Sequence, residues 1–201
     1  MKVIIPENIS DISLKQFQEI VEFTEKDDIS EAEIKAEKIR IFTCLSYKQI
    51  ESISKSDFDT LVNSIDEALN KPAEFENTFE MAGITFGFHP NLDQMNTSEY
   101  TDLMTYSGNT DELHKLMAIL FRPIADKDLL GNYTIVKYDG TAEFANKMLE
   151  TPLHIVNGAL MFFFHLSKEL QNNIQKYSNP KGAAKAKQHQ IFGLLGDGMQ
   201  Q

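Results

Sequence analysis

Apolar residues recur every three or four positions along most of the chain, and this spacing predicts a mainly helical protein. Two of the predicted helices begin at capping boxes, formed by Ser13 with Gln16 and by Ser30 with Glu33. A third is expected to begin at Ser56 and to stop at residues 71–72, Lys-Pro. Its apolar stripe is the most regular in the chain and consists of Phe58, Leu61, Val62, Ile65 and Leu69.

The spacing changes to two between residues 75 and 88, which predicts a small β-hairpin. Phe79 and Met81 alternate with polar residues before the turn, and Phe86 and Phe88 alternate after it. The turn is tight, and we expect it to need Gly83. Residues 2–5 and 133–138 alternate more weakly and predict one or two short extra strands. The predicted fold class is therefore mainly α, of the α+β type.

Helical spacing returns after the hairpin. Asn96 or Thr97 is the expected cap of one helix, and residues 113–120 form the next, stopped at Arg122-Pro123. An arginine at that place needs either a carboxylate or the terminal carbonyl groups of the helix. The favoured interpretation is that Arg122 caps the helix.

The last predicted helix begins at Thr151, an N-cap followed by proline. Residues 155–164 are apolar on nearly every side, so we expect them to run through the middle of the core, whereas residues 166–177 are apolar on one side only. Residues 1–178 are thus predicted to form one domain. Residues 179–201 are predicted to form a flexible basic tail with an apolar end, which is either frayed sequence or a docking peptide.

Charge and composition narrow the possible partners. The net charge is −11, and residues 1–80 hold 18 acidic and nine basic side chains. Such an acidic body repels nucleic acid; it serves solubility, or it offers an acidic face to a basic partner. The longest apolar run is far shorter than the roughly 20 residues that span a membrane, so no membrane association is expected. The single cysteine, Cys44, is predicted to be a small buried hydrophobe.

No motif for catalysis, metal binding or cofactor binding is recognisable in the sequence. Zinc-protease, Walker A and dinucleotide-binding signatures are all missing. His154 and His165 share a helix face but lie about 16 Å apart along the axis, too far to bind one ion. Glu99, Asp111 and Glu112 stand where the helix dipole favours acidic side chains. We therefore predict no catalytic residue, no metal and no cofactor.

Three stretches carry a resemblance to a known class of proteins. They are Phe-Gly-Phe-His-Pro-Asn-Leu-Asp-Gln-Met-Asn-Thr-Ser-Glu-Tyr-Thr-Asp-Leu at 86–103, His-Lys-Leu-Met-Ala-Ile-Leu-Phe-Arg-Pro-Ile at 114–124, and residues 152–170. Together they resemble small proteins encoded among the structural genes of tailed bacteriophages, including tail assembly chaperones. The resemblance covers most of residues 1–178. It implies a role in virion assembly with protein partners and no cofactor, in the host cytoplasm or in the virion.

Three functions remain open at this point. The first expectation is a tail assembly chaperone that binds other phage structural proteins. The second is a virion component such as a connector, ring or tail subunit, which would form homo-oligomers, and the third is an enzyme. The residues predicted to contact a partner protein are Phe88, Pro90, Tyr100 and Arg122 in the body and Ile191, Phe192, Leu194 and Leu195 in the tail.

Overall fold

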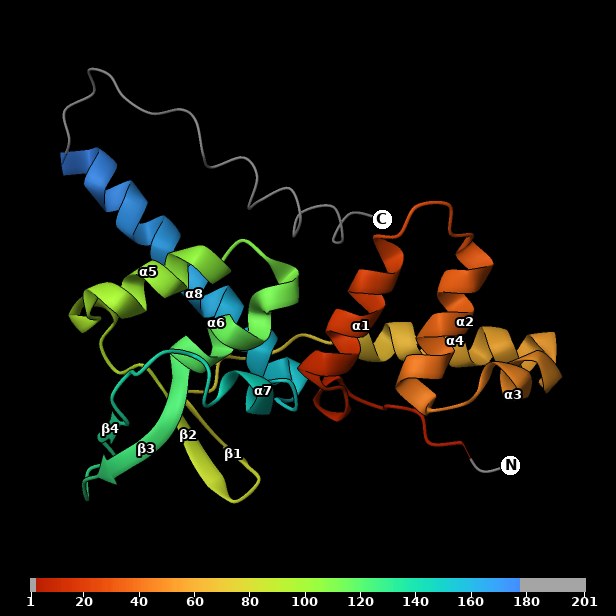
Figure 1. Ribbon diagram of the computed structural model, residues 1–201, viewed down its shortest axis with the longest axis horizontal. Coiled ribbons are helices and arrows are strands. Elements are labelled where there is room, and N and C mark those ends of the chain that lie inside the picture. The colour runs from red at the N-terminus through yellow and green to blue at the C-terminus, as the bar shows by residue number, and fades with distance from the viewer. Residues whose placement is uncertain (1–2, 178–201) are drawn as a thin grey trace. The chain divides into compact units, whose positions relative to one another are not determined.

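The computed structural model describes residues 3–177, in which eight α-helices accompany a small antiparallel sheet (Figure 1). This architecture confirms the predicted mainly helical α+β class. In chain order the elements are α1 (Leu14–Thr24), α2 (Glu31–Thr43), α3 (Tyr47–Ser52), α4 (Lys55–Leu69), β1 (Thr78–Met81), β2 (Ile84–Phe88), α5 (Thr97–Tyr106), α6 (Leu113–Leu120), β3 (Phe121–Lys127), β4 (Tyr133–Ile135), α7 (Ala145–Met148) and α8 (Leu153–Tyr177). Short 3-10 turns, η1 (Ile9–Asp11), η2 (Leu92–Gln94) and η3 (Thr110–Glu112), lie between them.

The chain divides into two compact units, residues 1–161 and residues 162–201. The first unit holds every element up to α7 together with the start of α8. The second holds the rest of α8. The tail predicted for residues 179–201 lies outside the described residues, so the proposed boundary at residue 178 stays a prediction.

The first four helices follow the capping pattern closely. Ser13 and Ser30 each accept the backbone N–H three residues ahead, as both capping boxes predict. The predicted cap of α4 is wrong by two residues, because the Ser54 hydroxyl, not that of Ser56, accepts the N–H of Asp57. The short α3, which begins after Ser46, was not predicted at all, since six residues are too few to show a period.

The sheet has the order β1-β2-β3-β4, and every neighbouring pair is antiparallel. The predicted hairpin is confirmed as β1 and β2, although β1 begins at Thr78 and not at residue 75. Its two turn residues, Ala82 and Gly83, both have positive φ, of 51° and 75°. This is the type I′ conformation, which suits the twist of a hairpin and favours glycine.

Two expectations about strands and helix ends are wrong. Residues 3–5 form no strand, because no neighbouring strand is placed to pair with so short a run. Arg122 does not cap α6, because that helix ends at Leu120 and the chain continues directly as β3. Proline at position 123 suits this strand: the register pairs it with Phe86, and its carbonyl accepts the N–H of Val136.

Phenylalanine rings fill the space between the sheet and the helices. Phe79 stacks on Phe86, with ring centroids 5.3 Å apart, and Phe121 meets both Phe79 and Phe88 edge-on at 5.1 and 5.2 Å. Such edge-on contacts are favourable for aromatic rings. Five consecutive residues of α6, from position 116 to position 120, are almost completely buried. Helix α6 therefore lies inside the first unit.

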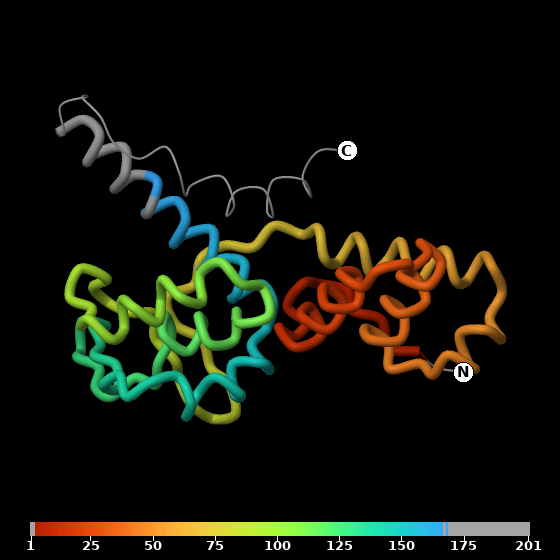
Figure 2. Tube along the Cα trace, turned by 45° about the horizontal axis from the view of Figure 1, so that its top comes forward, coloured from red at the N-terminus to blue at the C-terminus, as the bar shows by residue number. Residues whose placement is uncertain are grey.

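A hydrogen-bonded seam joins the start of α1 to the chain before α8. Leu14 donates its N–H to the carbonyl of Thr151 at 2.9 Å, and Leu153 donates to the carbonyl of Ile12 at 2.7 Å. On one side of this seam lie α1 to α4, and on the other lie the sheet, α5 and α6 (Figure 2). Helix α8 begins at Leu153, directly after Pro152, so the predicted N-cap at Thr151 lies one residue too early; the Thr151 hydroxyl donates to the sulfur of Met148 at 3.4 Å.

The predicted central position of α8 is correct only for its first two turns. Ile155, Val156 and Ala159 are buried, and a methyl group added at Gly158 would lie 2.3 Å from the Glu74 carbonyl oxygen. Met161, however, is 62% exposed. Apolar residues on every side of a helix did not guarantee burial.

Candidate protein-interaction surface

Helix α5 is anchored through a carboxylate on its buried side. Glu99 is 4% exposed, and its Oε2 accepts the N–H of Asn96 at 2.7 Å to close a capping box. Its other oxygen, Oε1, lies 2.6 Å from a guanidinium nitrogen of Arg122, which is itself 4% exposed. The expected helix-dipole role of Glu99 is confirmed, and the same carboxylate also ties α5 to β3.

A second carboxylate strengthens this attachment. The Tyr138 hydroxyl donates a hydrogen bond to Asp102 Oδ2, and the Arg122 guanidinium lies over the Tyr138 ring at 5.6 Å. Burial raises the pKa of Tyr138, and the hydrogen bond to Asp102 raises it further, so the hydroxyl keeps its proton. Arg122 Nε, in contrast, has no hydrogen-bond partner in the described part of the chain. The two ties hold α5 in a fixed orientation on the first unit.

His89 lies beside the same ion pair but does not add a charge to it. Its Nε2 is 3.8 Å from Glu99 Oε1, a separation that fits an ion pair if the ring is protonated. Burial lowers the pKa of His89, and the positive charge of Arg122 lowers it further. The ring is therefore neutral at pH 7, and its Nδ1 accepts the N–H of Asn91 at 3.3 Å. The net result is one buried ion pair with a neutral neighbour.

The outward face of α5 carries no charged residue. Its six exposed side chains are those of Thr97, Ser98, Tyr100, Thr101, Met104 and Thr105. Tyr100 is 57% exposed and Met104, one turn later, is 54% exposed. The hydroxyls of Thr101 and Thr105 donate to the carbonyls four residues back, both at 2.8 Å. A partner could therefore cover these threonines without leaving their hydroxyl groups unpaired.

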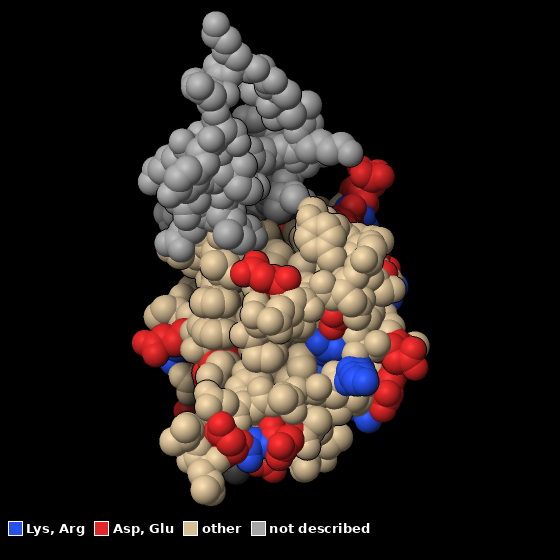
Figure 3. Space-filling model, turned by 90° about the vertical axis from the view of Figure 1, so that its left-hand side faces the viewer, with Lys and Arg blue, Asp and Glu red and all other residues tan. Residues whose placement is uncertain are grey.

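Helices α1 and α4 are different. The exposed positions of α1 include Lys15 and Glu19, and those of α4 include Asp59 and Glu67. Uncharged residues, in tan, also make up most of the face in Figure 3, which views the end of the molecule that carries α5 and β4. Interface cores are depleted in charged residues and enriched in aromatic residues and methionine. The outward face of α5 shares the lack of charge and holds one tyrosine and one methionine among four hydroxyl residues.

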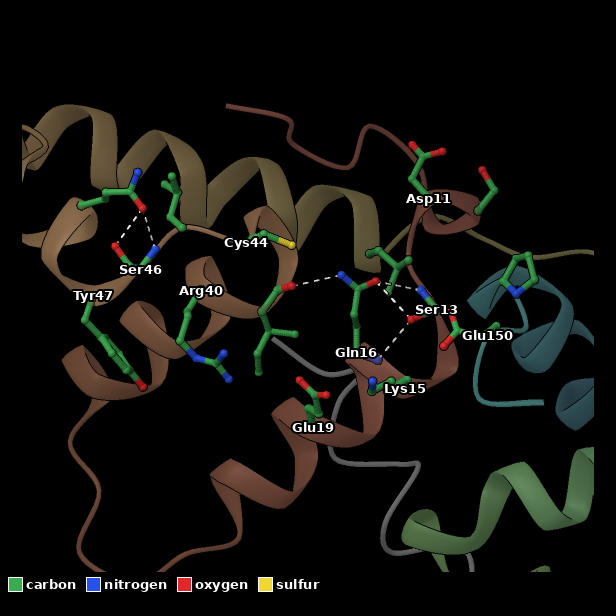
Figure 4. Close-up of a pocket in the computed structure, with 16 residues that line it drawn as sticks. Asp11, Ser13, Lys15, Gln16, Glu19, Arg40, Cys44, Ser46, Tyr47 and Glu150 are labelled. Carbon is green, nitrogen blue, oxygen red and sulfur yellow. Dashed lines mark hydrogen bonds between the residues drawn. The ribbon is translucent and has the colours of Figure 1, made fainter. Parts of the chain in front are cut away.

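An open groove of about 890 Å³ lies elsewhere, between the start of α1, the end of α2 and the start of α3 (Figure 4). Some of its polar groups are engaged by the fold: Gln16 completes the cap of α1 and donates to the Ile41 carbonyl at 3.0 Å, and Ser46 bonds Gln49. None of the 16 residues that line it is a histidine. The lining therefore offers no histidine base beside Cys44 or the serines.

Cys44 lines this groove, and the prediction that it is buried is wrong. The residue follows the last turn of α2 with φ 57° and ψ 21°, the left-handed conformation that commonly ends a helix. Cys44 is exposed there, whereas its neighbours Thr43 and Leu45 are buried. The left-handed conformation at the end of α2 thus directs Cys44 outward from an otherwise apolar run.

The predicted contact residues of the body fall into two groups. Phe88 and Arg122 are buried, at 5% and 4% exposure, so neither is available to a partner in this structure. Phe88 packs on Phe75 with ring centroids 5.0 Å apart. Pro90 and Tyr100 are exposed, and Tyr100 lies on the uncharged face of α5. The tail residues Ile191, Phe192, Leu194 and Leu195 lie outside the described residues.

Sequence reasoning missed Met104, Thr101 and Thr105 as members of the same face. The available signal was the placement of the two charges of α5, Glu99 and Asp102, which lie three residues apart and thus on one side of the helix. It also missed two leucines between β3 and β4. Leu129 and Leu130 are 106% and 89% exposed, within a run of turn-forming residues.

Comparisons of the chain with known protein families, with curated proteins and with solved structures found no match. Within the described residues, no three His, Cys, Asp or Glu side chains are grouped so as to hold a metal ion. None of the helices described combines the length and apolarity needed to cross a bilayer.

Proposed function

We propose that this protein is a non-enzymatic assembly factor of a tailed bacteriophage, which binds other structural proteins of the virion in the manner of a tail assembly chaperone. It acts in the host cytoplasm through the uncharged outward face of α5. The phage assignment comes from the sequence resemblance. The surface assignment comes from the structure.

The observation that supports the proposal best is the composition of α5. The chain is 24% charged with a net charge of −11, yet the six exposed positions of this helix hold only threonine, serine, tyrosine and methionine. The helix is held from its buried side by the Glu99–Arg122 pair. A fixed surface loses little conformational entropy when a partner binds, so more of the contact energy appears as affinity.

Binding to purified partners tests the proposal. Each structural protein encoded in the same virion gene cluster would be purified and titrated against the full chain by calorimetry. We expect at least one to bind, and we expect Met104→Glu to weaken that binding at least about tenfold, as for a central interface residue. Asn63→Glu places the same charge on an exposed, uncharged position of α4 and is the matched control. It should change the affinity less than about twofold.

Two results would overturn the proposal. In one, no structural protein binds the wild-type chain. In the other, Met104→Glu and Asn63→Glu bind equally well. Mass spectrometry of purified particles distinguishes a chaperone from a virion component. A chaperone is absent from the mature virion, whereas a connector, ring or tail subunit is present.

A further inference from the structure

The turn between β3 and β4 presents two leucines to solvent. Leu129 is fully exposed and Leu130 is 89% exposed, more than any other large apolar side chains among the described residues. The turn that joins β3 to β4 and carries them lies at the lower left of Figure 1. Single exposed apolar residues are common. Two adjacent leucines at such exposure forgo the favourable free energy that two buried core side chains would contribute.

The turn is ordered in spite of its exposure. Asp128 Oδ1 accepts the N–H groups of Leu130 and Asn132, both at 2.8 Å, while Asp128 Oδ2 accepts the side-chain amide of Asn132 at 2.8 Å. The backbone adds a bond from the Asp128 N–H to the Asn132 carbonyl at 2.9 Å. Gly131, with φ 91°, takes a conformation that strains other residues. The backbone that carries the two leucines is therefore fixed by hydrogen bonds within the turn.

Charge decides between a protein and a membrane as the partner. The tip is flanked by Asp126, Lys127 and Asp128, so two negative charges stand against one positive charge. An anionic lipid surface attracts clusters of Lys and Arg, and it repels a chain of net charge −11. A protein pocket that is apolar inside and basic at its rim matches both the leucines and the acidic flank.

We propose that Leu129 and Leu130 form a second contact, which inserts into an apolar pocket with a basic rim on the same partner protein that covers α5. This inference rests on the proposed function, because it assumes that the chain binds a structural protein. It adds to that function by naming Leu129 and Leu130 as the side chains that fill the partner's pocket. The Asp128 network acts as a positioning device that keeps both leucines extended.

The test uses the structural protein that binds best in the calorimetric panel described above. The double variant Leu129→Ser with Leu130→Ser should bind at least about tenfold more weakly, because the buried apolar anchors are lost. Asp128→Ala keeps both leucines but removes the turn's side-chain bonds, and it should weaken binding by a smaller factor. Ile4→Ser removes a single apolar side chain that is 79% exposed and is the matched control, with little change expected.

The outcomes separate this inference from the proposed function. If the wild-type chain binds a structural protein and the leucine double variant binds it equally well, the second contact is wrong and the α5 proposal stands. If the wild-type chain binds none of the panel, both are wrong. Sedimentation with vesicles of phosphatidylcholine and phosphatidylglycerol completes the test: leucine-dependent binding to vesicles would replace the protein pocket with a membrane and overturn the inference.

Discussion

Helices α4 and α5 distribute their side chains in opposite ways. Helix α4 buries Leu61, Val62, Ile65 and Ala68 and exposes four charged residues, which is the ordinary arrangement of a surface helix. Helix α5 buries a carboxylate and one leucine, and it exposes Tyr100 and Met104. Because Tyr100 and Met104 are more than half exposed, their burial adds little to the stability of the isolated chain. The difference supports the proposal that α5 binds a partner, whereas α4 serves the fold alone.

Removing the interactions that hold each helix should therefore lower the free energy of unfolding by different amounts. Helix α4 is held by apolar burial and a hydroxyl cap, whereas α5 depends on a buried ion pair. Breaking a buried pair by removing one member leaves an uncompensated charge, which is far more costly than the loss of a surface contact.

The largest effect is expected for Arg122→Ala, which leaves the Glu99 carboxylate buried and without its counter-ion. We expect the free energy of unfolding to fall by about 3–5 kcal/mol, measured by urea denaturation. Lys35→Ala is the control, since it breaks an exposed pair with Glu31 and should change stability very little. A loss for Arg122→Ala no greater than that of the control would show that the ion pair does not anchor α5.

A smaller effect is expected at the cap of α4. Ser54→Ala removes the hydroxyl that accepts the Asp57 N–H at 3.1 Å, and it should lower the free energy of unfolding by about 1 kcal/mol. Ser56→Ala, two residues later, removes a hydroxyl that does not cap the helix and should be close to neutral. A larger loss of stability for Ser56→Ala than for Ser54→Ala, in thermal or urea unfolding, would show that Ser56 is the cap.

The smallest effect concerns pH at the anchor of α5. Burial and Arg122 lower the folded-state pKa of His89 below 6.5, so the unfolded chain binds this proton more readily. The stability due to the neutral ring is fully present above pH 6.5 and is lost as the pH falls through the folded-state pKa. The wild-type chain should thus lose stability more steeply below pH 6.5 than His89→Gln. Parallel pH profiles for the two proteins would refute this role of His89.

Local patterns predicted the helices well, because a helix is determined mainly by neighbours three and four residues apart. Both capping boxes, the limits of α6 and the hairpin turn at Gly83 were all visible in the sequence. Strand β3 was not, since Arg122-Pro123 also matches a helix stop, and only pairing with β2 distinguishes the two. The periodicity of a single segment does not predict which distant strand it pairs with.

The candidate surface was harder to predict than the fold. Tyr100, Leu103 and Met104 share a helical spacing that is typical of a core stripe, yet only Leu103 is buried. The side that faces inward is decided by Glu99, whose partner Arg122 lies 23 positions away in the sequence. Nothing local reveals that pairing. The spacing of Glu99 and Asp102 marks one charged side of α5, but the sequence does not tell that this side faces inward.

Amide hydrogen exchange on the full chain, with and without the structural protein that binds it, tests the central claim most directly. The proposed contact predicts slower exchange in α5, residues 97–106, when the partner is present, with no change in α4, residues 55–69. Protection confined to α4 or to the groove between α1 and α3, with α5 unchanged, would contradict the claim that the uncharged face of α5 binds the partner.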